Sequence, residues 1–166
     1  LNLQQQVGCT LFALQTTDKQ IDRFEVIDGI IICKADEVEQ VISVFESVLC
    51  DRDKVGIDVN DIKRSCGSEK TAKFIQARVT GIPDSEQIKS NVNHLLNQIP
   101  EDLSIEYMML DIESDHKLSL DEFFSITTAV ENRIADDSEV FYGNRIIDKP
   151  DYCWMKAIYV AGYHGR

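Results

Sequence analysis

The residues from Asp111 to Glu122 have the spacing of a calcium-binding loop. Oxygen-bearing side chains fall at positions 1, 3, 5, 9 and 12 of this stretch, which is the ligand pattern of an EF-hand. The candidate ligands are Asp111, Glu113, Asp115, Ser119 and Glu122. Position 6 is His116, where the sharp turn of such a loop requires glycine, and the segment before the loop is typical of a strand instead of a helix. The favoured alternative is a strand-to-helix loop in which Ser119 and Glu122 form a capping box.

A second acidic pair, Asp58 and Asp61, stands where the sequence predicts the start of a helix. The residue types alone indicate that Asp58 is the helix cap. They indicate that Asp61 is a first-turn acid, which the helix dipole stabilises. On the residue types alone, these structural roles are favoured over a catalytic one.

The remaining reactive side chains form no recognisable catalytic set. The three histidines are far apart, and the five cysteines include no C-x-x-C pair, so we expect reduced thiols and no zinc site. The eight glycines are scattered, except for Gly162 and Gly165 near the end of the chain. Backbone amides can surround a phosphate only where glycines cluster. We therefore expect the chain alone to bind no GTP and no other cofactor.

Length and charge exclude several classes of protein. The 166 residues suffice for one ordinary domain, with or without an appendage. The net charge of −12 disfavours nucleic acid and anionic membranes as partners, since both are recognised through clustered Lys and Arg. No run of about 18 apolar residues could insert into a membrane, and no signal peptide is evident. We expect a cytoplasmic protein, and its first residue, Leu1, leaves open whether the chain is a fragment or the whole protein.

Residues 1–50 are expected to form a strand-rich segment and a linking helix. Residues 10–15 and 24–33 are rich in β-branched and aromatic side chains, as strands are. From Asp36 the period changes. Apolar residues then recur at helical spacing as far as Leu49, which predicts the clearest helix of the chain.

Residues 51–166 are expected to form an α/β domain. Its predicted helices start at Asp58, Asp84 and Ser119, and its predicted strands cover residues 73–79, 103–112, 140–147 and 152–161. Strands joined by helices indicate parallel pairing. The short turn between the last two strands allows a hairpin. The prediction is a mixed four-stranded sheet packed with helices.

The order of several motifs resembles the bacterial cell-division protein FtsZ. The sequence SLDEFF from Ser119 is similar to the Thr/Ser-Leu-x-Glu start of a helix near the end of that family. The segment DDSEVFYGNRIID, residues 136–148, resembles the family's next strand, which has an Ile-Ile-Phe-Gly core. KAIYVAGY, residues 156–163, resembles its last strand, which ends in a Gly-aromatic pair. The resemblance covers residues 51–166, and more weakly DGIIICKAD, residues 28–36, which is similar to the strand entering the family's central helix.

The resemblance implies a role for the acidic pair. GIDVNDI, residues 56–62, is similar to the family's synergy loop, N-x-D-x-x-D, with Asp58 and Asp61 at the two acidic positions. In that family this loop polarises the water that attacks GTP on the neighbouring subunit. The implied partners are other copies or FtsZ/tubulin-like subunits, and GTP and magnesium are implied only for the complete filament. Gly56 replaces the family's Asn, which puts efficient catalysis in doubt.

Three functions therefore remain open. The chain is the C-terminal half of an FtsZ/tubulin-like cytoskeletal GTPase, a non-enzymatic regulator that binds a filament end, or a calcium-binding module that uses Asp111, Asp115 and Glu122.

Overall fold

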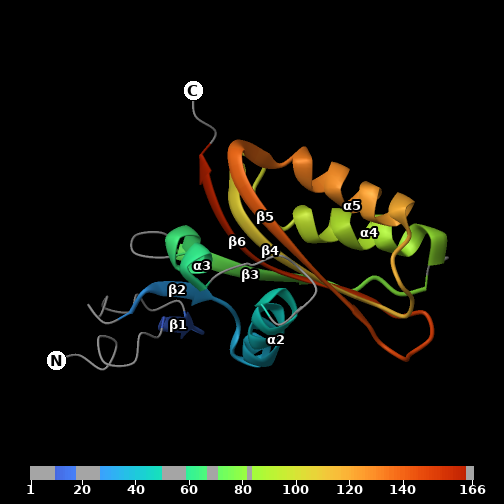
Figure 1. Cartoon of the computed structure of the whole chain (residues 1–166), viewed down its shortest axis with the longest axis horizontal. Coiled ribbons are helices and arrows are strands. Elements are labelled where there is room, and N and C mark those ends of the chain that lie inside the picture. Colours follow the sequence, from blue (N-terminus) through green and yellow to red (C-terminus); the bar gives the residue numbers. More distant parts are fainter. Residues whose placement is uncertain (1–9, 18–26, 50–58, 67–70, 82–83, 164–166) are drawn as a thin grey trace.

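The computed structural model describes residues 10–17, 27–49, 59–66, 71–81 and 84–163. They form one mixed sheet with helices on both faces (Figure 1). The N-terminal elements are β1 (Phe12–Gln15), β2 (Gly29–Ile32), the 3-10 turn η1 (Ala35–Glu37), α2 (Val38–Leu49) and α3 (Val59–Cys66). The later elements are β3 (Thr71–Ala77), α4 (Asp84–Leu96), β4 (Leu103–Ser114), α5 (Leu120–Glu131), β5 (Ile134–Ile146) and β6 (Cys153–Tyr163).

The six strands follow the order β1-β2-β3-β6-β4-β5. The strands β1, β2 and β3 are parallel, β5 is parallel to β4, and β6 is antiparallel to both β3 and β4. The mixed α/β class is confirmed. The sheet has six strands instead of four because β1 and β2 join it through β3, so the two predicted segments share one sheet.

The predicted hairpin between the last two strands is wrong. β5 pairs with β4 at one edge, while β6 lies between β3 and β4. The physical reason is the burial of β4, whose two faces are both covered along almost its full length. Such a strand needs a neighbour on each side. The α5 crossover places β5 parallel on one side, and β6 supplies the other.

The element boundaries differ most at the sheet edge. The predicted strand 140–147 begins earlier, at Ile134, and its additional residues include the exposed acids Asp136 and Asp137. This part of β5 lacks apolar alternation because it contains several acidic side chains. Charged side chains are well tolerated on an edge strand. Residues 24–26 of the second predicted strand lie outside the described residues.

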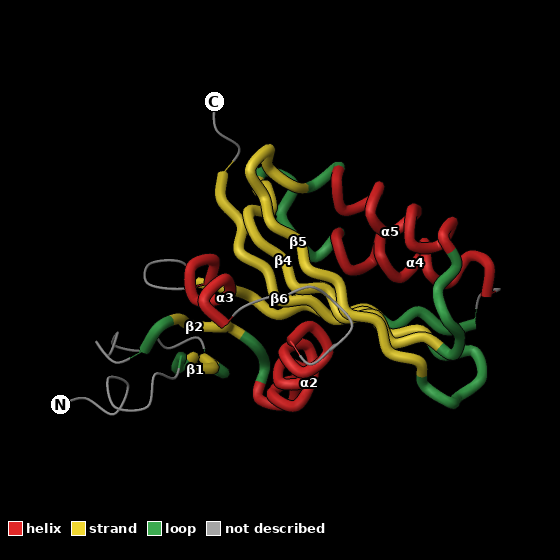
Figure 2. Tube along the Cα trace, in the orientation of Figure 1, coloured by secondary structure: helices red, strands yellow, loops and turns green. Residues whose placement is uncertain are grey.

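The helices α4 and α5 cover one face of the sheet, and α2 and α3 lie against the other (Figure 2). On the α4/α5 face, Leu95, Ile126 and Val130 pack against Leu110 and Met155, and all of these side chains are fully buried. Burying a large aliphatic side chain contributes about 2 kcal/mol. Apolar burial therefore holds this layer together.

The α2 face combines apolar packing with charge. Val41 and Val44 of α2 are buried there, but the alternation of β4 also points Asp111 and Glu113 to this face. α2 approaches the sheet closely at Gly143, because a Cβ atom there would collide with the Ser47 side chain. The residue type at position 143 thus sets how near α2 lies to the charges.

Candidate functional site

The acidic pair Asp58 and Asp61 is the first of two polar groups that could form a site. Asp61 lies in the first turn of α3 and is partly exposed. Asp58 and Gly56 lie outside the described residues. α3 is fixed beside Asp61 by the buried Ile62 and by an ion pair from Lys63 Nζ to Asp28 Oδ1 at 2.7 Å. The described residues therefore hold Asp61 at a defined place at the start of the helix, as the sequence predicts.

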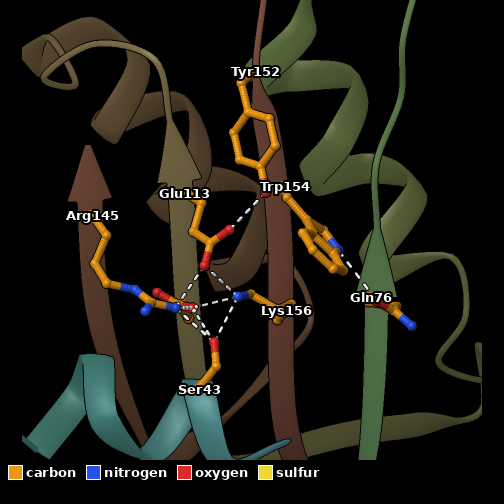
Figure 3. A network of polar contacts seen from close by, with 8 residues as sticks. Ser43, Gln76, Glu113, Arg145, Tyr152, Trp154 and Lys156 are labelled. Atoms are coloured by element: carbon orange, nitrogen blue, oxygen red, sulfur yellow. Dashed lines mark hydrogen bonds and ion pairs between the residues drawn. The ribbon is translucent and has the colours of Figure 1, made fainter. Parts of the chain in front are cut away.

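The second group is a buried ionic network that joins three strands (Figure 3). Lys156 Nζ from β6 lies 2.6 Å from Glu113 Oε1 and 3.0 Å from Asp111 Oδ2, both on β4. Arg145 Nη2 from β5 lies 2.8 Å from Asp111 Oδ2 and 2.6 Å from Glu113 Oε1. Two carboxylates therefore face two cations across neighbouring strands.

The hydroxyl of Ser43 connects α2 to this network. Its Oγ accepts hydrogen bonds from Lys156 Nζ at 2.7 Å and from Arg145 Nη2 at 2.6 Å. The same hydroxyl lies 3.5 Å from Asp111 Oδ2, to which it can donate. Bonds to charged groups are short and directional, and they are about twice as strong as neutral ones. The network therefore fixes the position of α2 along the sheet.

Burial makes the balance of charge important. Lys156 is 2% exposed and Asp111 is fully buried, and an uncompensated charge at such depth is strongly destabilising. Burial opposes the charge of Arg145, but the Asp111 bond and the nearby carboxylates outweigh it and raise the pKa of the guanidinium. Tyr152 donates from its hydroxyl to Glu113 Oε2 at 2.9 Å. Burial and this bond raise the pKa of Tyr152 to about 12, so the phenol stays a donor.

Aromatic side chains cover one end of the network. Trp154 Nε1 donates to Gln76 Oε1 at 3.2 Å, as Figure 3 shows, and Lys156 Nζ lies 4.9 Å from the centre of the indole ring. The guanidinium of Arg78 stacks over Tyr152 at 4.8 Å. Protein groups bind Asp111 Oδ2 and both carboxylate oxygens of Glu113, while Asp111 Oδ1 and Arg145 Nε are buried without a hydrogen-bond partner. The arrangement is suited to hold α2 in register with the strands. The sequence signal for it was the i, i+2 spacing of Asp111 and Glu113 within an apolar strand.

The five calcium-loop candidates are not brought together. Asp111 and Glu113 instead form ion pairs with Arg145 and Lys156 on the α2 face. Ser119 caps α5 by accepting from the Glu122 backbone N–H at 3.2 Å, while Glu122 Oε2 accepts from the Ser119 N–H at 2.7 Å, so the capping box is confirmed. Among the residues that the structure describes, no three His, Cys, Asp or Glu side chains are grouped to hold a metal.

His116 occupies the space between the other two acids of that loop. Its Nδ1 lies 2.5 Å from Asp115 Oδ1, and its Nε2 lies 2.9 Å from Glu122 Oε1. These two bonds raise the pKa of His116. The His116 bond lowers the pKa of Asp115. Burial opposes ionisation of Glu122, but the bonds from Ser119 and His116 outweigh it and lower the pKa of this carboxyl.

The described thiols have no catalytic setting. Cys33 and Cys153 are buried and free. Burial, reinforced by the charges of Asp115 and Glu122, raises the pKa of Cys153 to about 12, so it has almost no thiolate at neutral pH. His94 lies on the exposed side of α4, and His164 lies outside the described residues.

A pocket of about 460 Å³ lies at the carboxyl ends of β1 and β2, where ligands often bind α/β sheets. Its lining includes Cys33, Lys34 and Lys73. The buried Glu37 carboxylate at this pocket already accepts from the Lys34 N–H and from Gln76 Nε2. No glycine is among the described residues that line it, and Gly143 instead faces the side chain of Ser47. The described lining of this pocket therefore lacks the glycine-rich backbone that typically surrounds a phosphate.

None of the described helices has both the length and the apolar character needed to span a bilayer.

Comparison with known proteins identifies the fold. No protein-family model matches the sequence, and no curated protein does. A point mutant of FtsZ from M. jannaschii superposes with a TM-score of 0.64 at 14% identity, covering 84% of this chain and 48% of the FtsZ chain. The empty FtsZ dimer of the same organism gives 0.61 at 11% identity, with 83% and 46% covered.

A third solved structure is more distant. TubZ of Bacillus thuringiensis serovar israelensis, solved as GDP-form protofilaments, gives a TM-score of 0.49 at 11% identity and covers 81% of this chain and 42% of its own. The chain spans about half the length of the FtsZ structures that it matches. The two FtsZ superpositions therefore show that the chain has an FtsZ-like fold.

Proposed function

We propose that the chain works in an FtsZ/tubulin-like cytoskeletal filament, as the half of a subunit that meets the next subunit head to tail. The observation that carries this proposal is the FtsZ fold over 84% of the chain, together with Asp61 at the start of α3. In the sequence, Asp61 is at the second acidic position of the motif that resembles the synergy loop. The partners would be further copies of the chain or related subunits in the cytoplasm.

The chemistry proposed for this half is positioning. GTP and magnesium on the neighbouring subunit would supply the phosphoryl group and neutralise its charge. Phosphoryl transfer then needs a well-placed nucleophile and little covalent chemistry. Asp58 and Asp61 of this chain would orient a water molecule, with their carboxylates accepting its hydrogen bonds.

The ionic network supports this role indirectly. α2 ends at Leu49 and α3 begins at Val59, and both helices are anchored to the same face of the sheet. Ser43 anchors the first through Lys156 and Arg145, and Ile62 anchors the second. Asp61, in the first turn of α3, therefore has a defined position relative to the sheet, which is what positioning requires.

The test measures GTP turnover and sedimentation of an FtsZ/tubulin-like protein from the same cells, with and without the purified chain. Asp58→Asn and Asp61→Asn should leave co-sedimentation intact and lower the turnover that the chain supports by at least about 100-fold, since transition-state positioning is lost. The matched control is Glu86→Gln, an exposed acid in the first turn of α4 on the other face of the sheet.

Two results would contradict the proposal in different ways. In the first, the chain co-sediments and shortens the filaments, but the two substitutions do not change GTP turnover. This result would identify a filament-end regulator that needs no nucleotide. Absence of co-sedimentation would remove the cytoskeletal role altogether. The native size adds a direct check, since a GTP-binding half on the same polypeptide would make the protein about twice as large as the chain's 18.9 kDa.

A further inference from the structure

The carboxylate of Asp28 joins the first two strands to α3. Asp28 directly precedes β2, and Leu11 directly precedes the neighbouring β1. The Asp28 N–H donates to the carbonyl oxygen of Leu11 at 2.8 Å, and the Leu11 N–H donates to Asp28 Oδ2 at 2.8 Å. The other carboxylate oxygen, Oδ1, lies 2.7 Å from Nζ of Lys63 on α3. One oxygen therefore binds the start of β1 and the other binds α3, while the Asp28 side chain is only 10% exposed.

The rotation of α3 about its own axis depends on this ion pair. α3 has only 8 residues, and a helix this short is held in place mainly by its tertiary contacts. Its buried Ile62 fixes how deeply the helix lies against the sheet, but apolar contacts are non-directional. The ion pair from Lys63 to the fixed Asp28 carboxylate is directional, so it selects one rotation of the helix.

The rotation of α3 decides the direction of Asp61. Consecutive residues of an α-helix point about 100° apart, so Asp61 and Lys63 lie on opposite sides of Ile62. α3 lies beside β2 in Figure 1, with Lys63 held at the Asp28 end of that strand. Because Lys63 is held on one side of the helix, the Asp61 side chain is directed to the other side.

We propose that Asp28 is a positioning residue for the proposed GTP turnover and acts through Lys63 on Asp61. This inference rests on the proposed function, because the direction of Asp61 matters only if a neighbouring subunit uses it. An ion pair with an exposed lysine contributes little to stability, so a purely structural pair could be removed without changing turnover. A positioning pair could not, since a displacement of about 1 Å can cost about 100-fold in rate.

The test repeats the GTP turnover and co-sedimentation experiment with variants of the whole chain. Asp28→Asn keeps an acceptor for the Leu11 N–H but removes the charge, and Lys63→Gln removes the opposite charge. Each should lower the turnover that the chain supports about tenfold, because Asp61 is misdirected but still present. Co-sedimentation and the urea midpoint should stay unchanged.

Two further variants show whether the two side chains act as one contact. The double variant Asp28→Asn/Lys63→Gln should be no worse than either single variant, because both substitutions break the same ion pair. Lys63→Arg keeps a cation opposite Asp28 and should retain turnover to within about twofold.

Amide chemical shifts of the isolated chain give a readout that does not depend on GTP. Asp28→Asn should shift the amides of residues 60–63, which are distant from it in the sequence, because α3 rotates. The matched control Lys89→Gln changes an exposed lysine of α4, on the other face of the sheet, and should alter neither these shifts nor turnover.

The outcomes separate failure of this inference from failure of the proposed function. The wild-type chain could support turnover that Asp28→Asn and Lys63→Gln leave unchanged, or their losses could add up in the double variant. Either result would show that Asp28 does not position Asp61, while the proposed function would stand. If the wild-type chain supports no turnover, the proposed function fails and this inference fails with it, even where the amides of α3 shift.

Discussion

The two faces of the sheet are built on different principles. The α4/α5 face is mainly apolar, and its buried amide Asn91 is satisfied by bonds with the backbone of Val79 and Gln87. The buried charged side chains among the described residues all lie on the α2 face. They are Glu37, Asp111, Glu113 and Lys156. One face is thus held by apolar area and the other by directional bonds.

The two kinds of contact constrain the two helix layers differently. Apolar packing is non-directional, because the free energy that it contributes depends on the apolar area removed from water. An ionic pair in the interior tolerates little, because a displaced partner leaves a buried charge uncompensated. α2 is therefore fixed in one position relative to the strands, whereas α4 and α5 need only cover their face.

The largest expected effect is the loss of one buried charge. Lys156→Met should lower the free energy of unfolding by about 4 kcal/mol, since Asp111 and Glu113 then share a single cation in the interior. Urea denaturation followed by Trp154 fluorescence measures this change. The double variant Asp111→Leu/Lys156→Met removes one charge of each sign and should recover most of the lost stability. Equal losses in the single and double variants would mean that charge balance does not hold α2.

A somewhat smaller effect is expected on the opposite face. Leu95→Ala should cost about 3 kcal/mol, because it leaves a cavity among fully buried side chains. In the double variant Leu95→Ala/Lys156→Met, the loss in the free energy of unfolding should equal the sum of the two single losses to within about 0.5 kcal/mol. The two side chains lie on opposite faces of the sheet, so their effects should be independent. A strong coupling between the two variants in the same urea experiment would show that the two faces do not act independently.

The smallest effect concerns His116, whose contacts are exposed. The folded pKa of His116 is raised above its ordinary value of about 6.5, so its contribution to stability is complete below that pH. The contribution is lost as the pH rises through the folded pKa. It should amount to less than about 1 kcal/mol, because the side chain is 45% exposed.

Proton NMR titration of the His116 ring measures the pKa directly, and urea unfolding at pH 6 and pH 8.5 measures the stability. His116→Gln should remove the difference in stability between the two pH values. A midpoint at or below 6.5, or an unchanged difference in His116→Gln, would show that the two carboxylates do not hold the ring.

The sequence predicted the elements better than their arrangement. The helical spacing up to Leu49 and the capping box at Ser119 each gave an element of the right type, because local chemistry decides both. The place of β6 was missed, because strand order depends on contacts between residues distant in the chain. The ionic network was missed for the same reason. The spacing of Asp111 and Glu113 is compatible with calcium ligands, but in the structure Arg145 and Lys156 lie opposite them and form ion pairs with them.

The central place of β6 has a consequence for how the chain folds. β6 follows every other described strand in the sequence, yet it pairs with both β3 and β4 in the middle of the sheet. In the sheet, β1 to β3 and β4 to β5 are connected only through β6, so neither group can pair with the other before β6 is available. The middle of the sheet closes only when the last strand has emerged, and pairing between such distant segments is slow. A chain that stops before Cys153 would lack its Lys156 cation as well as the strand that joins its halves.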